Sequence, residues 1–154
     1  PYTTLFRSPE VRVQVVREYD PDTPRVPLDA GLLRPVLVNL ILNAFEALEG
    51  QGQVTLRVSQ GPEGAPRARW AEVEIADDGP GIPADVLEKI FYPFVTTKEG
   101  GSGIGLAMAR KVVECHHGLI DVTTEPGDGT TFRLRLPRQA ETVDGRTDAQ
   151  DSRG

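Results

Sequence analysis

The sequence predicts an α+β fold, a two-layer α/β sandwich in which helices cover one face of a mixed sheet. Three observations indicate this class. Apolar residues recur at helical spacing between residues 36 and 48. Residues 53–59 and 69–77 alternate between apolar and polar side chains, as half-buried strands do. Residues 119–124 and 131–136 are typical of two strands of a closing hairpin, joined by a turn rich in glycine.

Composition limits the chain to one domain with its own core, since it has 154 residues of which 38% are hydrophobic. The formal net charge is −6 and no run of Lys or Arg occurs, which argues against nucleic acid as a partner. The single cysteine, Cys115, excludes an internal disulfide and a cysteine-rich zinc site. We find no signal peptide and no membrane span, so we expect a cytoplasmic, monomeric segment without membrane contact. A membrane anchor elsewhere in the parent protein is left open.

The two ends of the chain differ from its centre. Residues 1–8 read like the translation of a common sequencing-library adapter, so we interpret them as a cloning or assembly scar outside the fold. On that interpretation the chain is the C-terminal part of something larger. Residues 138–154 contain three apolar residues and no aromatic residue, which predicts a disordered tail. The predicted domain is therefore residues 9–137.

The first half of this domain is predicted to hold two strands and a long helix. Residues 11–15 alternate as a strand, and residues 25–28 are predicted to form a short one. Asp29 is a suitable helix cap, and Pro35 suits a first helical turn. The helix follows over residues 36–48. Its core residues are predicted to be Val36, Leu37, Leu40, Ile41, Ala44 and Leu48.

The second half is predicted to continue the sheet and to add two helices. We expect the strands at residues 53–59 and 69–77 to pair across the Gly/Pro-rich loop between them. A short helix is predicted at residues 83–90, followed by an irregular stretch to residue 103. Residues 104–116 form the last predicted helix, which precedes the closing hairpin.

Asp77, at the end of a predicted strand, is the first candidate binding residue. It shares a side of the strand with Val73 and Ile75, so the alternation carries its carboxylate toward the core, where it needs a hydrogen-bond donor. Gly79 and Gly81 permit a flat ligand to approach the backbone closely. The exocyclic amine of a purine would satisfy the carboxylate. Alone, the stretch is more typical of an ordinary Asp-Gly turn.

Asn39, Asn43 and Glu46 lie on one side of the predicted long helix, at positions i, i+4 and i+7. An amide oxygen is a hard, neutral ligand that suits Mg²⁺, which takes few protein ligands when phosphates and waters complete its octahedron. Asn43 is the candidate metal ligand. A solvated helix surface is the alternative explanation for these three polar residues.

A second glycine-rich run, Gly100 to Leu106, directly precedes a predicted helix. Backbone N–H groups at such a helix N-terminus suit phosphate oxygens. The run is not a Rossmann fingerprint, because Leu106 stands where the third glycine belongs and no strand precedes it. It is not a Walker A motif either, because no lysine follows a glycine. A flexible hinge is the alternative.

Five motifs taken in order resemble the ATP-binding catalytic domain of bacterial sensor histidine kinases. The resemblance covers residues 10–137, and the Pro-Phe-Val-Thr-Thr-Lys form of the third motif is similar to nitrogen-regulation-type kinases. The motifs are Asn39 to Ala44, Asp77 to Pro83, Ile90 to Lys98, Gly101 to Ala107 and Gly127 to Phe132. The resemblance implies the Bergerat fold, which gyrases and mismatch-repair ATPases share, with ATP and Mg²⁺ as ligands.

The resemblance also implies residue roles. Asn39 and Asn43 would be the catalytic residues facing the phosphates, with Asn43 on Mg²⁺. Asp77 would bind the adenine amine beside Gly79 and Gly81. A lid would run from about residue 92 to 101, anchored by Phe91 and Phe94. The remaining expected nucleotide-binding residues are Lys98, Gly101, Ser102, Gly103, Ile104, Gly105, Leu106, Thr130 and Thr131.

Two departures from the family pattern qualify the implied activity. Hydrolysing relatives carry a water-activating glutamate where this chain has Asn39, and an amide is no general base, so transfer to another acceptor is favoured over hydrolysis. The segment that would bear the phosphoacceptor histidine is not in this sequence. His116 and His117 are interpreted as structural residues at a helix end.

The expected partners are therefore a dimeric helical hairpin that carries the phosphoacceptor histidine and, downstream, a response regulator. Two other functions stay open at this point. One is a nucleotide-binding regulatory module without phosphotransfer. The other is an ATP hydrolase, for which Glu46 is the available carboxylate.

Overall fold

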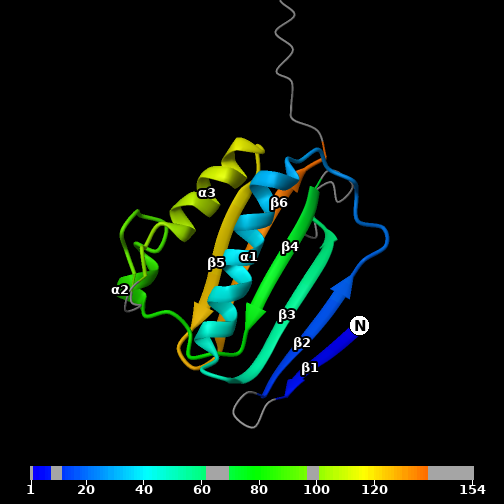
Figure 1. The fold of residues 1–154 in the computed structure, drawn as a ribbon. Coiled ribbons are helices and arrows are strands. Elements are labelled where there is room, and N and C mark those ends of the chain that lie inside the picture. The colour runs from blue at the N-terminus through cyan, green and yellow to red at the C-terminus, as the bar shows by residue number, and fades with distance from the viewer. Residues whose placement is uncertain (1, 8–11, 62–69, 97–100, 139–154) are drawn as a thin grey trace, which may run out of the picture.

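One mixed sheet and helices on one of its faces form the protein, as the sequence predicts (Figure 1). The computed structural model describes residues 2–7, 12–61, 70–96 and 101–138. The sheet order is β1-β2-β3-β4-β6-β5. The strands are β1 (Tyr2–Arg7), β2 (Arg12–Tyr19), β3 (Gln51–Gln60), β4 (Trp70–Asp77), β5 (Leu119–Glu125) and β6 (Gly129–Pro137). The helices are α1 (Ala30–Ala47), α2 (Ala84–Leu87) and α3 (Gly105–Cys115).

Strand pairing follows the predicted patterns. β2 and β3 are parallel, since α1 crosses between them, and every other neighbouring pair in the sheet is antiparallel. The predicted pairing of residues 53–59 with 69–77 is confirmed by the β3–β4 ladder. The predicted closing hairpin is confirmed by β5 and β6.

The two faces of the sheet differ in chemistry. The face under α1 and α3 carries buried apolar side chains, including Val54, Ile75 and Leu134. The opposite face carries ion pairs between neighbouring strands: Arg57 lies 2.7 Å from Glu18 and 2.8 Å from Glu74. The sheet therefore has one helix-covered layer, and its second face, which we call the open face, is polar.

Helix α1 begins earlier than predicted. The Asp29 side chain accepts hydrogen bonds from the backbone amides of Gly31 and Leu32, and the helix starts at Ala30. Asp29 is thus confirmed as the cap, but the placement of Pro35 in the first turn is wrong. Pro35 lies inside the helix, where its missing amide leaves one carbonyl of the preceding turn without its usual partner.

The short strand predicted at residues 25–28 is also wrong. These residues form part of the irregular connection between β2 and α1. Pro24 and Pro27 have no amide hydrogen to donate to a ladder, which explains why Val26 and Leu28 do not extend the sheet.

Residues 2–7 are part of the sheet, in contrast to our exclusion of residues 1–8 from the fold. β1 pairs antiparallel with the outer edge of β2. A run of Tyr, Thr, Leu and Phe has high strand propensity and pairs readily with the exposed edge of a sheet. Their origin as a cloning or assembly scar stays a prediction. The predicted tail lies outside the described residues from residue 139 onward.

Helix α1 has the length and apolar composition of a membrane-crossing helix, with a mean hydropathy of 1.3 over 18 residues. In this fold it is the core helix. Leu33, Val36, Leu40 and Ala44 are buried against the sheet and α3, which accounts for one side of the helix. The core position accounts for these four residues, whereas Leu32, Val38 and Leu42 on the same helix are about half exposed.

His116 joins the C-terminal end of α3 to the N-terminal end of α1. Its Nε2 accepts a hydrogen bond from the Asp29 amide at 2.9 Å, and its Nδ1 lies 2.8 Å from the carbonyl oxygen of Val112. A ring that accepts at Nε2 and donates from Nδ1 is the neutral tautomer. His116 thus has the structural position that the sequence predicted.

Candidate functional site

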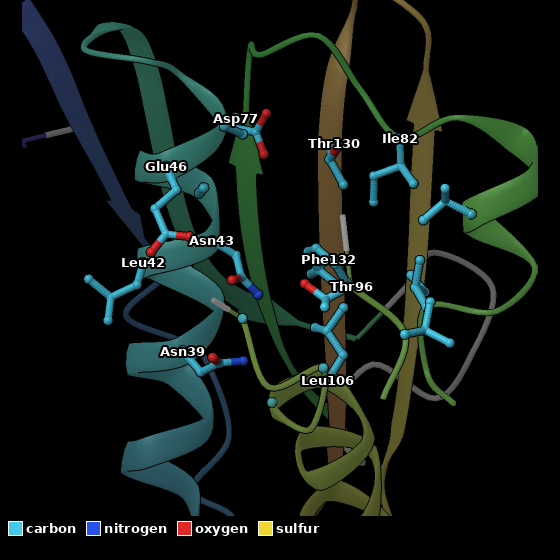
Figure 2. Close-up of a pocket in the computed structure, with 18 of the residues that line it drawn as sticks. Asn39, Leu42, Asn43, Glu46, Asp77, Ile82, Thr96, Leu106, Thr130 and Phe132 are labelled. Carbon is cyan, nitrogen blue, oxygen red and sulfur yellow. The ribbon is translucent and has the colours of Figure 1, made fainter. Parts of the chain in front are cut away.

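A cavity of about 750 Å³ lies between α1, the end of β4 and the N-terminal end of α3 (Figure 2). It brings together residues that are far apart in the sequence. Ten of the predicted site residues line it: Asn39, Asn43, Asp77, Gly81, Gly101, Ser102, Gly103, Gly105, Leu106 and Thr130. Residues of all five motifs therefore line this one cavity.

Three described residues of the predicted set do not line the cavity. Gly79 lies behind the Asp77 carboxylate, where a side chain would meet Ala47. Ile104 is 40% exposed. Thr131 pairs with Ala76 and, by strand alternation from the inward Phe132, directs its side chain to the open face. These three residues therefore lie outside the lining of the cavity, and their roles as nucleotide-binding residues stay predictions. Lys98 lies outside the described residues.

Asp77 ends β4 with its carboxylate at the cavity (Figure 2). Its Oδ1 accepts a hydrogen bond from the Gly79 amide at 3.0 Å. Burial raises the pKa of the Asp77 carboxyl above its ordinary value of 3.8, and the backbone amides of Gly79 and Thr130 partly offset this effect. The inward direction predicted from strand alternation is confirmed. The site holds a carboxylate whose charge is only partly stabilised by the protein.

This raised pKa predicts how Asp77 affects stability. The folded state binds the Asp77 proton more tightly than the unfolded state, so the free energy of unfolding contributed by this group falls as pH rises above about 3.8 through the folded pKa. Asp77→Asn removes that loss. We expect the ligand-free variant to gain stability relative to the original chain as pH rises from about 4 to 7. Urea unfolding at several pH values measures this, and parallel pH profiles for the two proteins would contradict it.

The amides of Asn39 and Asn43 project from α1 into the cavity on the same side, as the helical spacing predicts (Figure 2). Asn39 Nδ2 is buried and has no hydrogen-bond partner among the described residues. It lies so close to the start of α3 that a Cβ on Gly105 would meet it at 2.7 Å. A buried donor without an acceptor is costly, so this position suits a ligand that brings an oxygen acceptor.

The N-terminal end of α3 offers further donors to the same part of the cavity. No side chain of the residues that the structure describes caps this helix, and its first residue is Gly105. The first amides of an uncapped helix have no partners within the helix and carry the positive end of the helix dipole. Gly103 precedes them with φ +65°, where a Cβ would meet the backbone of Phe94 at 2.6 Å. This end of the cavity therefore suits an anionic group, which supports the prediction that it binds phosphates.

The segment predicted as a lid is held at its base by backbone contacts. Phe94 donates its amide hydrogen to the carbonyl of Gly103 at 2.9 Å. Phe91 packs against the core, and the Arg110 guanidinium lies 5.8 Å from the centroid of its ring. Phe91 is therefore positioned to anchor this segment. Phe94 is 78% exposed, so it holds this segment through its backbone amide and not through its side chain. Residues 97–100 of the segment lie outside the described residues.

The sequence did not predict the apolar wall of the cavity. Ile82, Val86, Ile90 and Phe132 line it opposite α1. Phe132 pairs with Ile75 in the β4–β6 ladder, two positions from Asp77, so the wall adjoins the carboxylate. The apolar spacing from Ile82 to Ile90 was a signal for this surface, but it equally fits a helix packed on the core.

The two ends of the cavity suit different parts of one ligand. The apolar wall with Asp77 fits a flat ring that bears an amine, and the donors of Asn39 and α3 fit an anionic group. Asn43 offers an amide oxygen between them. The described residues contain no cluster of three His, Cys, Asp or Glu that could hold a metal alone. A bound cation would therefore need oxygen ligands from the anion, as Mg²⁺ commonly has.

Comparison with known proteins gives consistent results. The family model described as histidine kinase-, DNA gyrase B-, and HSP90-like ATPase matches residues 28–140. The sensory histidine kinase/phosphatase NtrB of Rhodobacter capsulatus is 43% identical over 130 residues, which are 80% of this chain and 36% of the relative. The sensor kinase CckA of Brucella abortus is 43% identical over 127 residues, which are 75% of this chain and 13% of the relative.

Solved structures agree with the sequence relatives. The catalytic domain of histidine kinase ThkA superposes with a TM-score of 0.70 at 32% identity, covering 82% of this chain and 79% of that domain. A structure of full-length ShkA in complex with AMPPNP gives a TM-score of 0.66 at 29% identity, covering 83% of this chain and 26% of ShkA. The chain thus spans about a third of the length of the NtrB relative and most of a catalytic domain.

Proposed function

Because the chain belongs to the family of histidine kinase-, DNA gyrase B- and HSP90-like ATPases, we propose that it presents ATP-Mg²⁺ for phosphoryl transfer to a histidine on a separate domain. It corresponds to the ATP-binding catalytic domain of two-component sensor histidine kinases. One observation carries the proposal. A single cavity joins the half-buried carboxylate of Asp77 to a donor-rich end that contains the side-chain amide of Asn39, whose nitrogen has no hydrogen-bond partner among the described residues.

The adenine ring is proposed to lie at the end of the cavity where β4 terminates. Its exocyclic amine would donate to the Asp77 carboxylate. Without the ligand, this carboxylate accepts hydrogen bonds from backbone amides, which offset only part of the effect of burial on its pKa. The faces of the ring would pack against apolar side chains such as Ile82 and Phe132. Guanine carries a carbonyl oxygen in place of this amine, so the site favours adenine.

The phosphates are proposed to lie at the N-terminal end of α3. Asn39 Nδ2 would donate to a phosphate oxygen, and the backbone amides that follow Gly103 would do the same. The amide oxygen of Asn43 would hold Mg²⁺, which supplies neutralisation of phosphate charge when bound. The contribution of the chain to catalysis is positioning and electrostatic stabilisation.

Asn39 directs the proposal toward transfer and away from hydrolysis. A general base must accept a proton, and the amide of Asn39 cannot do so at neutral pH. A histidine on another domain supplies its own nucleophilic nitrogen and needs no base from this chain. Glu46 also lines the cavity, one turn along α1 from Asn43, and this placement favours ATP hydrolysis as the second candidate function.

The proposed partner is the dimeric helical hairpin that carries the acceptor histidine. Three exposed apolar side chains belong to the elements that form this part of the cavity: Leu42, which lines it, is 52% exposed, Met108 near the start of α3 is 54% exposed, and Phe94, whose amide bonds the carbonyl of Gly103, is 78% exposed. Surfaces of this kind mark interaction sites. Transfer from the histidine to a response regulator would follow, in line with the solved complex of ThkA with response regulator TrrA. We propose a cytoplasmic location for these steps.

The isolated chain tests this function. With ATP labelled at the γ-phosphate, we expect Mg²⁺-dependent binding, no labelled protein and slow hydrolysis. His116 and His117 are the only histidines of the sequence, and they lie at the far end of α3, whose 11 residues span about 16 Å. In-line attack requires about 3 Å. Filter binding and release of inorganic phosphate measure the three quantities.

Two outcomes would contradict the proposal. Strong self-labelling that is lost in a His116→Ala/His117→Ala double variant would place the acceptor in this chain. Fast hydrolysis that Glu46→Ala abolishes would assign the chain as a hydrolase.

A further inference from the structure

Thr124 of β5 fastens the turn below the cavity to the β5–β6 hairpin. We call residues 77–82, from the last residue of β4 to Ile82, the floor turn. The amide of Ile82 donates to Thr124 Oγ1 at 2.9 Å. A second bond runs nearby, from the amide of Gly127 to the carbonyl of Pro80 at 2.9 Å. Thr124 does not line the cavity itself, so any effect on a ligand is indirect.

The hydrogen-bond pattern fixes the direction of the Thr124 hydroxyl. Its single hydrogen is donated to the carbonyl of Gly129 at 2.9 Å, while its lone pairs receive the Ile82 amide. Thr130 Oγ1 lies 3.3 Å from Thr124 Oγ1. Since the hydrogen of Thr124 is already used, Thr130 must be the donor of this third contact. The Thr130 hydrogen is therefore directed away from the cavity.

Thr130 thus offers a lone pair to a ligand. It is 5% exposed, lines the cavity and pairs directly with Asp77 in the β4–β6 register. Two oxygen acceptors, the Asp77 carboxylate and the Thr130 hydroxyl, then occupy neighbouring positions. An exocyclic amine has two hydrogens and can serve both acceptors, whereas a carbonyl oxygen at the same place meets lone pairs only.

We propose that Thr124 is a positioning residue for adenine selectivity, which it confers by holding the floor turn and by fixing Thr130 as a hydrogen-bond acceptor. The inference rests on the proposed function, because it concerns the purine end of the same cavity. Close packing supports it. A Cβ on Gly81 would meet the carbonyl oxygen of Glu125 at 2.5 Å and Thr124 Oγ1 at 3.0 Å. The floor turn and the hairpin therefore have no room to move closer to each other.

Removal of the hydroxyl has two expected consequences. In Thr124→Val the Ile82 amide loses its acceptor, which loosens the floor turn. The Thr130 hydroxyl also loses its acceptor, and its hydrogen becomes free to turn toward the cavity, where it can serve a carbonyl oxygen. The first effect weakens ATP binding, and the second improves GTP relative to ATP.

The experiment measures the dissociation constants of ATP and GTP with the full chain by calorimetry, for Thr124→Val, Thr124→Ser and Thr123→Val. We expect Thr124→Val to lower the ratio of ATP to GTP affinity by about tenfold, the value of roughly one hydrogen bond. Thr124→Ser retains the hydroxyl and should stay within about threefold of the original chain. Thr123 is the matched control, because it is the adjacent threonine and lies on the open face beside Arg133.

The outcomes separate this inference from the proposed function. An original chain that does not bind ATP selectively overturns both. Selective ATP binding that survives Thr124→Val, or an equal loss of ATP and GTP affinity, overturns only the role of Thr124 in selectivity. If valine is not accommodated in the fold, Thr124→Ala only removes atoms and carries the same expectation. In a Thr124→Ala/Thr130→Val double variant, the ratio of ATP to GTP affinity should fall no further than in Thr130→Val alone. The affinity for ATP itself should fall further, because the floor turn is loosened.

Discussion

Asp77→Asn is expected to weaken ATP binding by about ten- to a hundredfold. A hydrogen bond from the adenine amine to a charged carboxylate is worth roughly 1.5–3 kcal/mol, and Asn replaces the charged acceptor with a neutral amide. Burial already raises the pKa of Asp77, so a ligand donor has more to stabilise here than at an exposed carboxylate. Titration with ATP and with GTP measures the effect. ATP affinity should fall much more than GTP affinity.

The matched control for this variant is Asp121→Asn. Asp121 lies on the open face of the same sheet, 3.0 Å from Arg135, and loses its charge in the same way. It should leave ATP binding unchanged. Equal affinity of the original chain for ATP and GTP would remove the assignment of Asp77 to the adenine amine. Together with the expected gain in ligand-free stability, the binding loss would show that the Asp77 charge serves the ligand at a cost to the fold.

Asn43→Ala is expected to slow phosphoryl transfer to a partner hairpin by about a hundredfold or more. A metal ion that polarises a phosphoryl oxygen contributes several kcal/mol to the transition state, and Asn43 provides the proposed protein ligand. The variant should also lose the Mg²⁺-dependent part of ATP affinity. That second readout needs no catalysis: ATP is titrated with Mg²⁺ and again with EDTA. The two titrations should differ for the original chain and converge for the variant.

A variant that retains the full difference between the two titrations would contradict the metal role of Asn43. Val38→Ala is a suitable control, because Val38 lies on the same helix, is exposed and does not line the cavity. It should keep both the Mg²⁺ effect and the rate of transfer.

Local patterns predicted most of the fold, and the failures have local causes too. The alternation in β3 and β4 predicted both strands and their pairing, because each has one face in the core. The apolar spacing of α1 predicted its core side, but its start depended on the Asp29 cap, which overrides the preference of Pro35 for a first turn. The apolar residues at 25–28 were misread because strand propensity was considered without the missing proline amides.

The site was predicted where the chemistry lies within one element and missed where it depends on register. Asn39 and Asn43 share a side of α1 by spacing alone, and Asp77 faces inward by alternation. Thr130 and Thr131 are indistinguishable in the sequence. Only the β4–β6 register, which pairs Thr130 with Asp77, places one in the cavity and the other on the open face. Thr124 was missed because its partners belong to other elements.

Phosphoryl transfer in trans tests the central claim most directly. The chain is mixed with ATP labelled at the γ-phosphate, Mg²⁺ and the histidine-bearing dimeric hairpin that we propose as its partner. The proposed function predicts label on the hairpin, acid-labile and base-stable, that requires this chain and disappears when the acceptor histidine of the hairpin is replaced by glutamine. Binding of ATP without any transfer to the hairpin, or release of the label as inorganic phosphate at a rate that the hairpin does not change, would contradict it.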